Sequence, residues 1–320
     1  MKTNDHTVPQ SYLRRFAEER RGRGQFIVAT EADHVDRSFE TNVRNIAAVK
    51  GFYWASLDDG TSNHDAEHLF ARVEAATAPA FAAMLDDHKY ALSQRWPLPV
   101  HLRERLAWWM AAQVLRTTRQ RKRLAHLLDE SAPGLQLPSS LRKAAATNLH
   151  IAYVASQLGR LAGVLYGRPW GLGFSDACLL TSDVPVVLLN QHDAHEQVLA
   201  AAVCDILLAL DPHRFLFLPG AGHLEDRRKQ VDHRLKFDGG MGLALSEIIR
   251  DAADRHLLHH PVHPPQAVHS SDIRPRLARP WEGEDPKRSP QYSLSYNVLP
   301  AEYGVERRWL NEHPPRRSAS

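Results

Sequence analysis

The sequence predicts an α+β fold with a mainly helical core, a small N-terminal strand unit and a short antiparallel sheet near residues 177–218. Two observations support this prediction. Apolar residues repeat every three to four positions between residues 64 and 166, which is typical of long helices that share one core. Short runs of β-branched and aromatic residues, bounded by turn residues, lie before and after that region.

The first sixty residues are predicted to form a small mixed unit. Tyr12 and Phe16 are four positions apart, which indicates a short basic helix over residues 11–20. Residues 25–30 have the composition of a strand, and residues 45–54 supply a second apolar segment.

Three long helices are expected to form the main core. They cover residues 64–90, 101–129 and 139–166, with Ser139 as the N-cap of the third. Pro79 is expected to kink the first of them or to start a new helix.

The second half of the chain returns to short strands. Residues 178–189 are predicted to form a strand, a turn at Pro185 and a second strand. Residues 203–210 and 215–218 extend this sheet, and residues 242–259 are predicted to be helical.

We expect residues 1–260 to form one domain and residues 261–320 to form a basic, extended tail. Half of the chain's 20 prolines lie from Pro261 onward, which favours an extended backbone with limited structure of its own.

Composition favours a cytoplasmic protein without membrane association. The two cysteines lie inside apolar runs, which indicates reduced, buried thiols. The start of the chain lacks the apolar core of a signal peptide, and no apolar run approaches the length of a membrane span. A net charge of +3 permits nucleic-acid binding without arguing for it.

One N-terminal segment has an unusually specific pattern: His6-Thr-Val-Pro9-Gln10-Ser-Tyr12-Leu13-Arg14-Arg15-Phe16. It resembles the start of the bacterial DUF4238 family, a domain of unknown function. Further matches over about residues 5–262 are Lys50-Gly-Phe52-Tyr53, the acidic helix Glu67 to Glu74, Gln113-x-x-Arg116-Thr117, Trp170 and Thr181-Ser182-Asp183-x-Pro185. Val184 stands where the resemblance leads us to expect a polar residue, often asparagine. A family without an established activity implies no reaction.

The polar residues of these segments are the candidate site. If they converge in a cleft, His6 is the general base or acid, Asp183 orients it, and Arg116 binds a developing negative charge or a phosphate. Ser182 is a further candidate as a nucleophile, although a serine in a turn more often caps the backbone.

Six other residues of these segments are candidate binding residues: Gln10, Tyr12, Arg14, Glu67, Glu74 and Gln113. The alternative for the whole set is a buried, purely structural ion-pair network.

The strongest basic patch follows Arg116 and contains Arg119, Arg121, Lys122 and Arg123. Such a run is usually a solvated helix face, and the alternative is a surface for nucleic acid. Gly171-Leu-Gly173 lacks the other glycines and the lysine of a phosphate-binding loop.

We predict no metal site. The segment His64-Asp-Ala-Glu67-His68 has the H-x-x-E-H spacing of a zinc protease motif, but a chain with 19 histidines produces such matches easily. A second histidine cluster, from His256 to His263, is expected at a helix end. Cofactor and oligomeric state stay open.

Two classes of function follow. The first is a hydrolase that acts on a phosphorylated or nucleic-acid substrate through a His/Asp/Arg site. The second is a non-catalytic module that binds nucleic acid or a partner protein through the basic helix 116–123 and the Pro-rich tail.

Overall fold

The computed structural model describes residues 4–56, 62–85, 96–131, 138–175, 177–190, 197–237, 241–265, 292 and 294–299 of the 320-residue chain. The α-helices are α1 (Gln10–Leu13), α2 (Asp65–Leu85), α3 (Val100–Leu115), α4 (Thr118–Ser131), α5 (Ser139–Gly167), α6 (Gln197–Val203) and α7 (Met241–Ala252). The 3-10 helices are η1 (Arg14–Phe16), η2 (Val43–Asn45), η5 (Ala221–His223) and η6 (Arg227–Lys229). The strands are β1 (Asn4–His6), β2 (Glu18–Arg20), β3 (Gly24–Glu31), β4 (His34–Asn42), β5 (Ala48–Lys50), β6 (Ala55–Ser56), β7 (Ser62–Asn63), β8 (Gly171–Phe174), β9 (Thr181–Ser182), β10 (Val186–Leu188), β11 (Ile206–Ala209), β12 (Arg214–Leu218), β13 (His233–Phe237), β14 (His256–His259) and β15 (Tyr296–Leu299).

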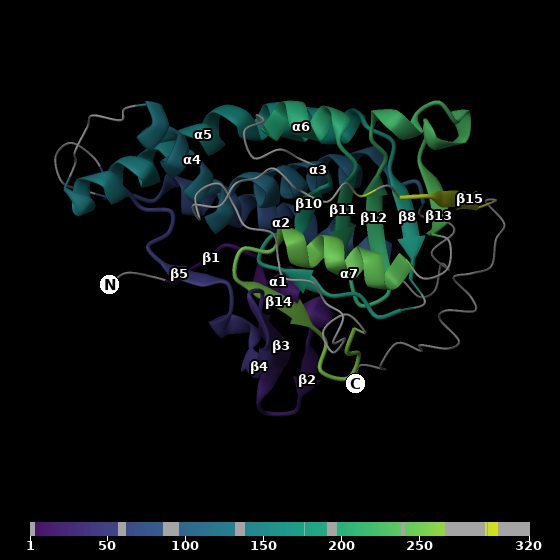
Figure 1. Ribbon diagram of the computed structural model, residues 1–320, viewed down its shortest axis with the longest axis horizontal. Helices are drawn as coiled ribbons and strands as arrows, with labels where there is room; N and C mark the ends of the chain where they lie inside the picture. The colour runs from purple at the N-terminus through teal and green to yellow at the C-terminus, as the bar shows by residue number, and fades with distance from the viewer. Residues whose placement is uncertain are drawn as a thin grey trace.

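The fold is α+β, as the sequence predicted. Its largest sheet has six strands in the order β10-β11-β12-β8-β13-β15. Helix α7 lies across one face of this sheet and α3 lies behind it (Figure 1). Every residue of β8, β11 and β12 is buried, because both faces of these strands are covered. The sheet extends on both sides of the predicted range and is mixed, since β8 and β13 run parallel.

Two glycines in β8 allow side chains of the neighbouring strands to pack directly over it. A Cβ atom on Gly173 would lie 2.1 Å from the Phe215 ring, and one on Gly171 would lie 2.4 Å from Leu235. Because neither glycine carries a side chain, residues from both neighbouring strands cross over β8. The Gly-x-Gly pattern is therefore a requirement of packing.

A second sheet joins distant parts of the chain. It has the order β2-β3-β14-β9, with β4 also paired to β3. The predicted N-terminal strand unit is therefore incomplete without β9 and β14, which come from much later in the sequence. This sheet lies below the helical layer in the view of Figure 1.

The N-terminal segment is anchored through Tyr12. Its ring contacts Phe81 of α2 and Trp109 of α3, with centroids 6.3 Å and 5.2 Å away. Its hydroxyl is 2.7 Å from the Thr181 hydroxyl and donates to the Ala209 carbonyl at 2.7 Å. One fully buried side chain thus connects the helical layer to both large sheets.

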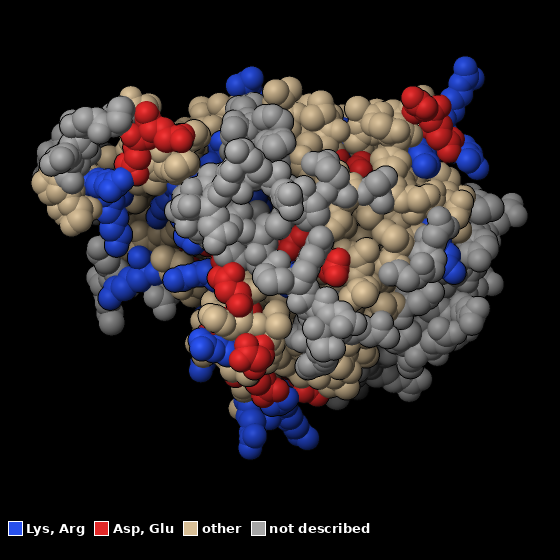
Figure 2. Space-filling model, viewed as in Figure 1, with Lys and Arg blue, Asp and Glu red and all other residues tan. Residues whose placement is uncertain are grey.

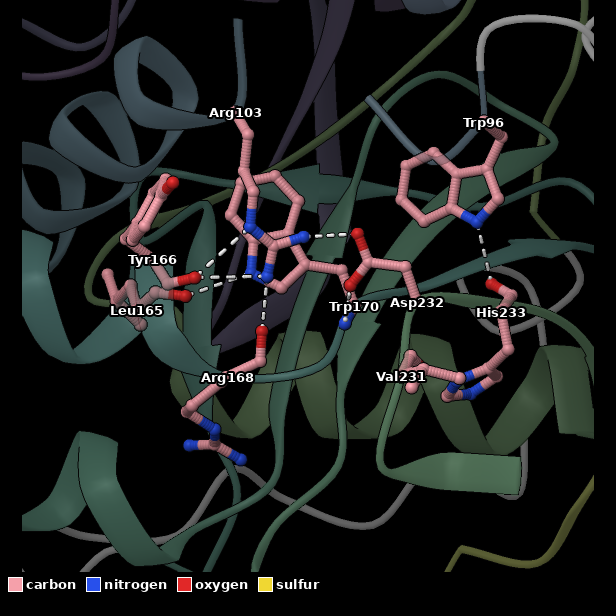
Figure 3. Close-up of polar contacts among 9 residues, drawn as sticks. All are labelled: Trp96, Arg103, Leu165, Tyr166, Arg168, Trp170, Val231, Asp232 and His233. Carbon is pink, nitrogen blue, oxygen red and sulfur yellow. Dashed lines mark hydrogen bonds and ion pairs between the residues drawn. The ribbon is translucent and has the colours of Figure 1, made fainter. Parts of the chain in front are cut away.

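Arg103, near the start of α3, is the centre of a group of polar contacts that we call the Arg103 cluster (Figure 3). Arg103 donates to the carbonyl oxygens of Tyr166 and Arg168, pairs with Asp232, and lies 4.3 Å from the centre of the Trp170 ring. Asp232 also accepts from the Trp170 backbone N–H at 2.9 Å. These contacts hold α3, the end of α5 and the start of β8 together.

Three helix predictions were wrong in extent. The helix expected over residues 11–20 ends in η1 and is followed by β2. The helix expected over 101–129 is two helices, α3 and α4, because the backbone leaves the helical conformation at Arg116. The helix expected to reach His259 ends at Ala252.

The early end of α7 has a clear cause. The Asp183 carboxylate accepts hydrogen bonds from the backbone N–H groups of Asp254, Arg255 and His256. Since these three groups find partners outside a helix, the chain turns and enters β14. The cluster that starts at His256 consequently lies on a strand and the turn after it.

Other differences concern ends and gaps. Helix α5 begins at Ser139, but its N-cap is Pro138. Residues 86–90 of the first predicted helix lie outside the described residues. Strand β15, in the region expected to be a tail, pairs antiparallel with β13, and most of that region also lies outside the described residues. Within the described ranges, no helix has the length and apolar character needed to cross a bilayer.

Candidate functional site

Five polar side chains from three parts of the chain form what we call the His6 cluster. They are the hydrogen-bonded pair His6 and Gln10 from the N-terminal segment, and the group of Glu74 from α2 with Gln113 and Arg116 from the end of α3, whose charges act on His6. All five were candidate residues in the sequence, so the structure brings together a part of the predicted site.

Arg116 is the buried centre of the cluster. Its guanidinium Nη1 donates to Glu74 Oε1 at 2.7 Å. With the Gln113 amide turned so that its oxygen faces Arg116, that oxygen accepts from Nε at 3.1 Å and Nη2 at 2.9 Å. The Phe70 ring covers the guanidinium at 5.0 Å. The Arg116 side chain is 1% exposed and that of Glu74 is 30% exposed. Arg116 therefore orients Glu74, and Glu74 is the member of the pair that meets solvent.

His6 lies on the half-buried side of the cluster. Its Nε2 is 3.1 Å from the Arg44 carbonyl oxygen and 3.3 Å from the Gln10 amide nitrogen. Burial lowers the pKa of His6, while the Arg44 carbonyl and the charge of Glu74 raise it and the charge of Arg116 lowers it again. The net decrease in pKa leaves the imidazole neutral at pH 7, which is the form that accepts a proton.

A strand pair carries His6 and a lysine on one face. Strands β1 and β5 are antiparallel, with His6 opposite Ala48 and Asn4 opposite Lys50. Directly opposed residues share a face, and so do residues two positions apart, so the side chains of His6 and Lys50 lie on the same face of the ribbon. Lys50 is exposed. Basic and acidic side chains lie close together on the side of the molecule that holds β1 and β5 (Figure 2).

The Thr-Ser-Asp turn has a structural role at each polar position. Thr181 bonds Tyr12, as described above. The Ser182 hydroxyl accepts from the Val184 N–H at 3.1 Å and donates to the Val184 carbonyl at 3.0 Å. Val184 itself is buried, so the position that departs from the family pattern packs in an apolar environment.

The expected arrangement of His6, Arg116 and Asp183 does not form. Asp183 is buried and its carboxylate binds the backbone of residues 254–256 at 2.8 to 3.3 Å. Within the described ranges, no hydrogen bond or ion pair joins Asp183 to His6 or Arg116. Burial raises the pKa of Asp183, and the three N–H donors oppose that effect.

The remaining candidates lie apart from one another. Tyr12 is fully buried, which explains its position in the motif without a ligand. Arg14 is exposed in η1. Glu67 lies in the first turn of α2, with its Oε2 3.9 Å from His64 Nδ1, while Glu74 pairs with Arg116.

The basic run on α4 faces the protein, which makes the expectation of a solvated face wrong. Arg119 donates to the Ala252 carbonyl at 3.2 Å, Arg121 to His150 at 3.1 Å and Arg123 to Gln120 at 3.1 Å. Arg121 also lies 3.5 Å above the Phe52 ring. Lys122 is the exposed residue of the four, and it pairs with Asp254 at 2.8 Å.

The zinc-protease spacing at the start of α2 does not produce a ligand set. The His64 ring packs edge-on against Trp54 at 4.3 Å, and His68 is exposed. In the described part of the chain, His64, Glu67 and His68 do not bring three donor atoms together.

Comparison with known proteins identifies the family. Residues 4–261 match the model of DUF4238, described as a protein of unknown function, and the chain belongs to this family. No curated protein and no solved structure shows a detectable match.

Sequence reasoning missed one residue of this site. Lys50 lies in a segment that matched the family, but it had no assigned role. The register of β1 with β5 places it opposite Asn4 on the ribbon face that also carries His6, and no local pattern in the sequence predicts that pairing.

Proposed function

We propose that this protein is a hydrolase of a phosphorylated substrate and that His6 is its general base. The observation that carries the proposal is a half-buried, neutral imidazole beside the Glu74–Arg116 pair, on the same ribbon face as the exposed Lys50. A positioned base that takes a proton from water, and an exposed cation that stabilises negative charge on the phosphate, are groups that accelerate hydrolysis of a phosphate ester.

The proton transfer is assigned to one ring nitrogen. When His6 Nε2–H donates to the Arg44 carbonyl, the Gln10 amide turns its oxygen rather than its nitrogen toward Nε2, and the lone pair of the neutral ring is on Nδ1. Nδ1 then takes a proton from a water molecule as its oxygen bonds to phosphorus. The bond from phosphorus to the leaving oxygen breaks, and the imidazolium returns the proton to that oxygen.

Arg116 and Glu74 act as positioning residues in this proposal. A guanidinium that is 1% exposed and paired with Glu74 is not available to bind a phosphate directly, so Lys50 takes that role. The Glu74 charge favours the imidazolium that forms during the reaction. Ser182 and Asp183 are not part of the mechanism, since their polar atoms hold the backbone.

The alternative function is a nucleic-acid-binding module that uses the basic helix 116–123. The internal contacts of Arg119, Arg121 and Arg123 reduce the charge available to a ligand. We therefore treat nucleic-acid binding as an outcome of the test.

The test uses the full chain and a panel of chemically defined probes. These are p-nitrophenyl phosphate, bis(p-nitrophenyl) phosphate, 5′-nucleotides, and short single strands of RNA and DNA. We expect turnover of at least one probe. His6→Ala should lower kcat/KM by about 10²–10⁴-fold, as expected for loss of a general base. Lys50→Met should raise KM with a smaller change in kcat.

A matched histidine provides the control. His126 is also half-exposed and lies 3.3 Å from a glutamate, Glu130, but it is on α4 outside the cluster. His126→Ala should retain wild-type turnover. Absence of turnover for every probe contradicts the proposal, and so does equal loss in the His6 and His126 variants. Salt-dependent retention of RNA or DNA without turnover supports the binding module instead.

A further inference from the structure

Three metal-binding donors converge at a place that the His6 cluster does not include. The Sγ atom of Cys178 and one ring nitrogen each of His213 and His263 all lie within 4.8 Å of one another. Cys178 Sγ and His213 Nε2 are 3.9 Å apart. In the sequence, these residues are separated by tens of positions.

The loop of Cys178 and the turn of His213 are tied together by their backbones. Ser175 N–H donates to the His213 carbonyl at 2.8 Å, and Leu179 N–H donates to the Pro212 carbonyl at 2.6 Å. The Asp211 carboxylate accepts from the His213 N–H at 2.9 Å, which fixes the turn between β11 and β12. The positions of the thiol and the first imidazole are thus set before any ion binds.

The third donor comes from a hydrogen-bonded turn after β14. The His263 N–H donates to the His260 carbonyl at 3.1 Å. The His263 ring then meets the His213 ring edge-on, with centroids 5.4 Å apart, and the His260 ring at 4.8 Å. His260 Nδ1 accepts from the Val262 N–H, which stabilises the same turn.

The ring of His213 has the orientation of a ligand. Its Nδ1 lies 3.4 Å from the Ser175 carbonyl, and its Nε2 faces the thiol. When Nδ1–H donates to that carbonyl, the lone pair of the neutral ring is on Nε2. A ligating histidine usually has this support from a backbone carbonyl or a carboxylate.

The distances suit a small transition-metal ion. Bond lengths of about 2.3 Å to sulfur and about 2.0 Å to nitrogen place tetrahedral ligands roughly 3.3–3.7 Å apart. The Cys178–His213 separation of 3.9 Å is already close to this range. A separation of at most 4.8 Å leaves a movement of roughly 1 Å, which side-chain rotation of His263 supplies.

We propose that Cys178, His213 and His263 bind one zinc ion, with the fourth position open to water or an exogenous ligand. A thiolate and two imidazoles are soft and borderline donors, which select zinc over magnesium or calcium. His213 is buried, while Cys178 and His263 are half-buried, so an ion can enter from the solvent side. The site shares no residue with the His6 cluster, and it stands whether or not that cluster is catalytic.

A reactive cysteine is the competing explanation for this cluster. A catalytic Cys–His pair needs one imidazole to activate the thiol, whereas ring nitrogens of two histidines lie near Cys178 Sγ here. The approach of two histidines toward the sulfur is thus better explained by coordination.

The experiment measures metal binding in the untagged full chain. The metal content of protein purified from zinc-supplemented medium is determined by mass spectrometry, and the metal-free protein is then titrated with Co²⁺. We expect about one zinc per chain. With Co²⁺ we expect a thiolate-to-metal charge-transfer band and the strong visible bands of tetrahedral coordination.

Two variants and two matched controls make the result specific. Cys178→Ser and His213→Gln should each lose the zinc and the charge-transfer band. Cys204→Ser removes the other half-buried free thiol, and His256→Asn removes a histidine from β14, so both should retain binding. Zinc should raise the Tm of the wild type but not that of Cys178→Ser, measured from the same metal-free baseline.

Any one of three results would overturn the proposal. The wild-type chain binds neither zinc nor Co²⁺, the cobalt spectrum lacks the thiolate charge-transfer band, or Cys204→Ser loses as much metal as Cys178→Ser. If His213→Gln does not fold, the Cys178→Ser variant and the cobalt spectrum still decide, because serine preserves the shape of the side chain.

Discussion

Arg103 and Arg116 lie at opposite ends of α3 and differ in what surrounds them. Each guanidinium stacks on an aromatic ring and pairs with one carboxylate. Arg103 and Asp232 are equally buried, each 13% exposed, and Arg103 also binds two backbone carbonyls. Arg116 is more deeply buried, but its polar partners are side chains, and Glu74 reaches solvent beside a neutral histidine.

This difference separates a structural ion pair from a candidate site. Backbone carbonyls cannot change their charge or move independently of the fold, so a guanidinium bound to them holds elements together. Side-chain partners can move a proton and rotate, and those of Arg116 include a group that meets solvent. The alternative foreseen in the sequence, a buried ion-pair network, describes Arg103 well, although no motif had drawn attention to it.

The largest expected effect is the loss of stability when Arg103 is replaced, and it tests whether Arg103 forms a structural ion pair. Arg103→Met leaves Asp232 and two carbonyl oxygens without their cation, and the free energy of unfolding should fall by about 3–5 kcal/mol. Urea unfolding followed by circular dichroism measures it. Arg105→Met changes an exposed arginine of the same helix and should cost less than about 0.5 kcal/mol. Similar losses in the two variants would contradict a special role for the Arg103 cluster.

The second prediction concerns Arg121, which binds both a backbone carbonyl and a side chain, and it varies the pH. Arg121 donates both to the Phe52 carbonyl and to the side chain of His150, and His150 Nε2 also meets the Leu115 carbonyl at 2.7 Å. Burial, followed by the charge of Arg121, lowers the pKa of His150 to about 3. Between pH 6.5 and pH 3, the unfolded chain binds a proton at His150 that the folded chain does not bind. The free energy of unfolding should therefore decrease by about 1.4 kcal/mol for each unit by which the pH is lowered in this window.

The measurement is the difference between two stability profiles. The wild type and His150→Gln are unfolded in urea at several values between pH 7 and pH 4. The profile of the variant should be flatter by the stated slope. Parallel profiles would show that His150 is not held neutral by its surroundings.

The third prediction concerns the side-chain-bound arginine. Arg116→Met should cost about 1–3 kcal/mol, less than Arg103→Met, because the 30%-exposed Glu74 carboxylate regains water when its partner is lost. A double-mutant cycle with Glu74→Gln measures the coupling, expected at about 0.5–3 kcal/mol. A cost greater than that of Arg103→Met would place Arg116 in the structural class and weaken the proposed site.

The smallest effect is expected at Lys122. Its side chain is 45% exposed while that of Asp254 is 2% exposed, and Thr118 also donates to Asp254 at 2.6 Å. Lys122→Met should therefore cost about 1 kcal/mol or less. Thermal unfolding in low and high salt checks this value, and the difference in stability between the wild type and Lys122→Met should decrease as salt rises.

Local patterns predicted the helical core and the N-terminal anchor. The spacing of Tyr12 and Phe16 indicated one buried stripe, and both side chains are fully buried. Strand β4 was missed because most of its residues are exposed, so it lacks the alternation that marks a half-buried strand. The break before α4 was missed because the apolar spacing continues across Arg116 and Thr117, both of which are buried.

The candidate site was predicted only as far as adjacent motifs allowed. Glu74 and Arg116 pair with each other and their charges act on His6, but the partner of His6 was expected to be Asp183. A short turn rich in polar residues has the same sequence appearance whether it faces a ligand or holds the backbone, and here it holds residues 254–256. The Cys178, His213 and His263 group has no local signal, because three separate loops supply it.

The hydroxyl of Tyr12 has a consequence for synthesis of the chain. Its acceptor on Ala209 is 197 residues further along. At a translation rate of about 5–20 residues per second, the N-terminal segment waits roughly 10–40 s before that acceptor has been made. During this interval the Tyr12 hydroxyl of the ribosome-bound chain lacks its acceptor, the Ala209 carbonyl. The hydrogen bond that joins the N-terminal segment to the largest sheet is therefore made late, after more than half of the polypeptide has been made.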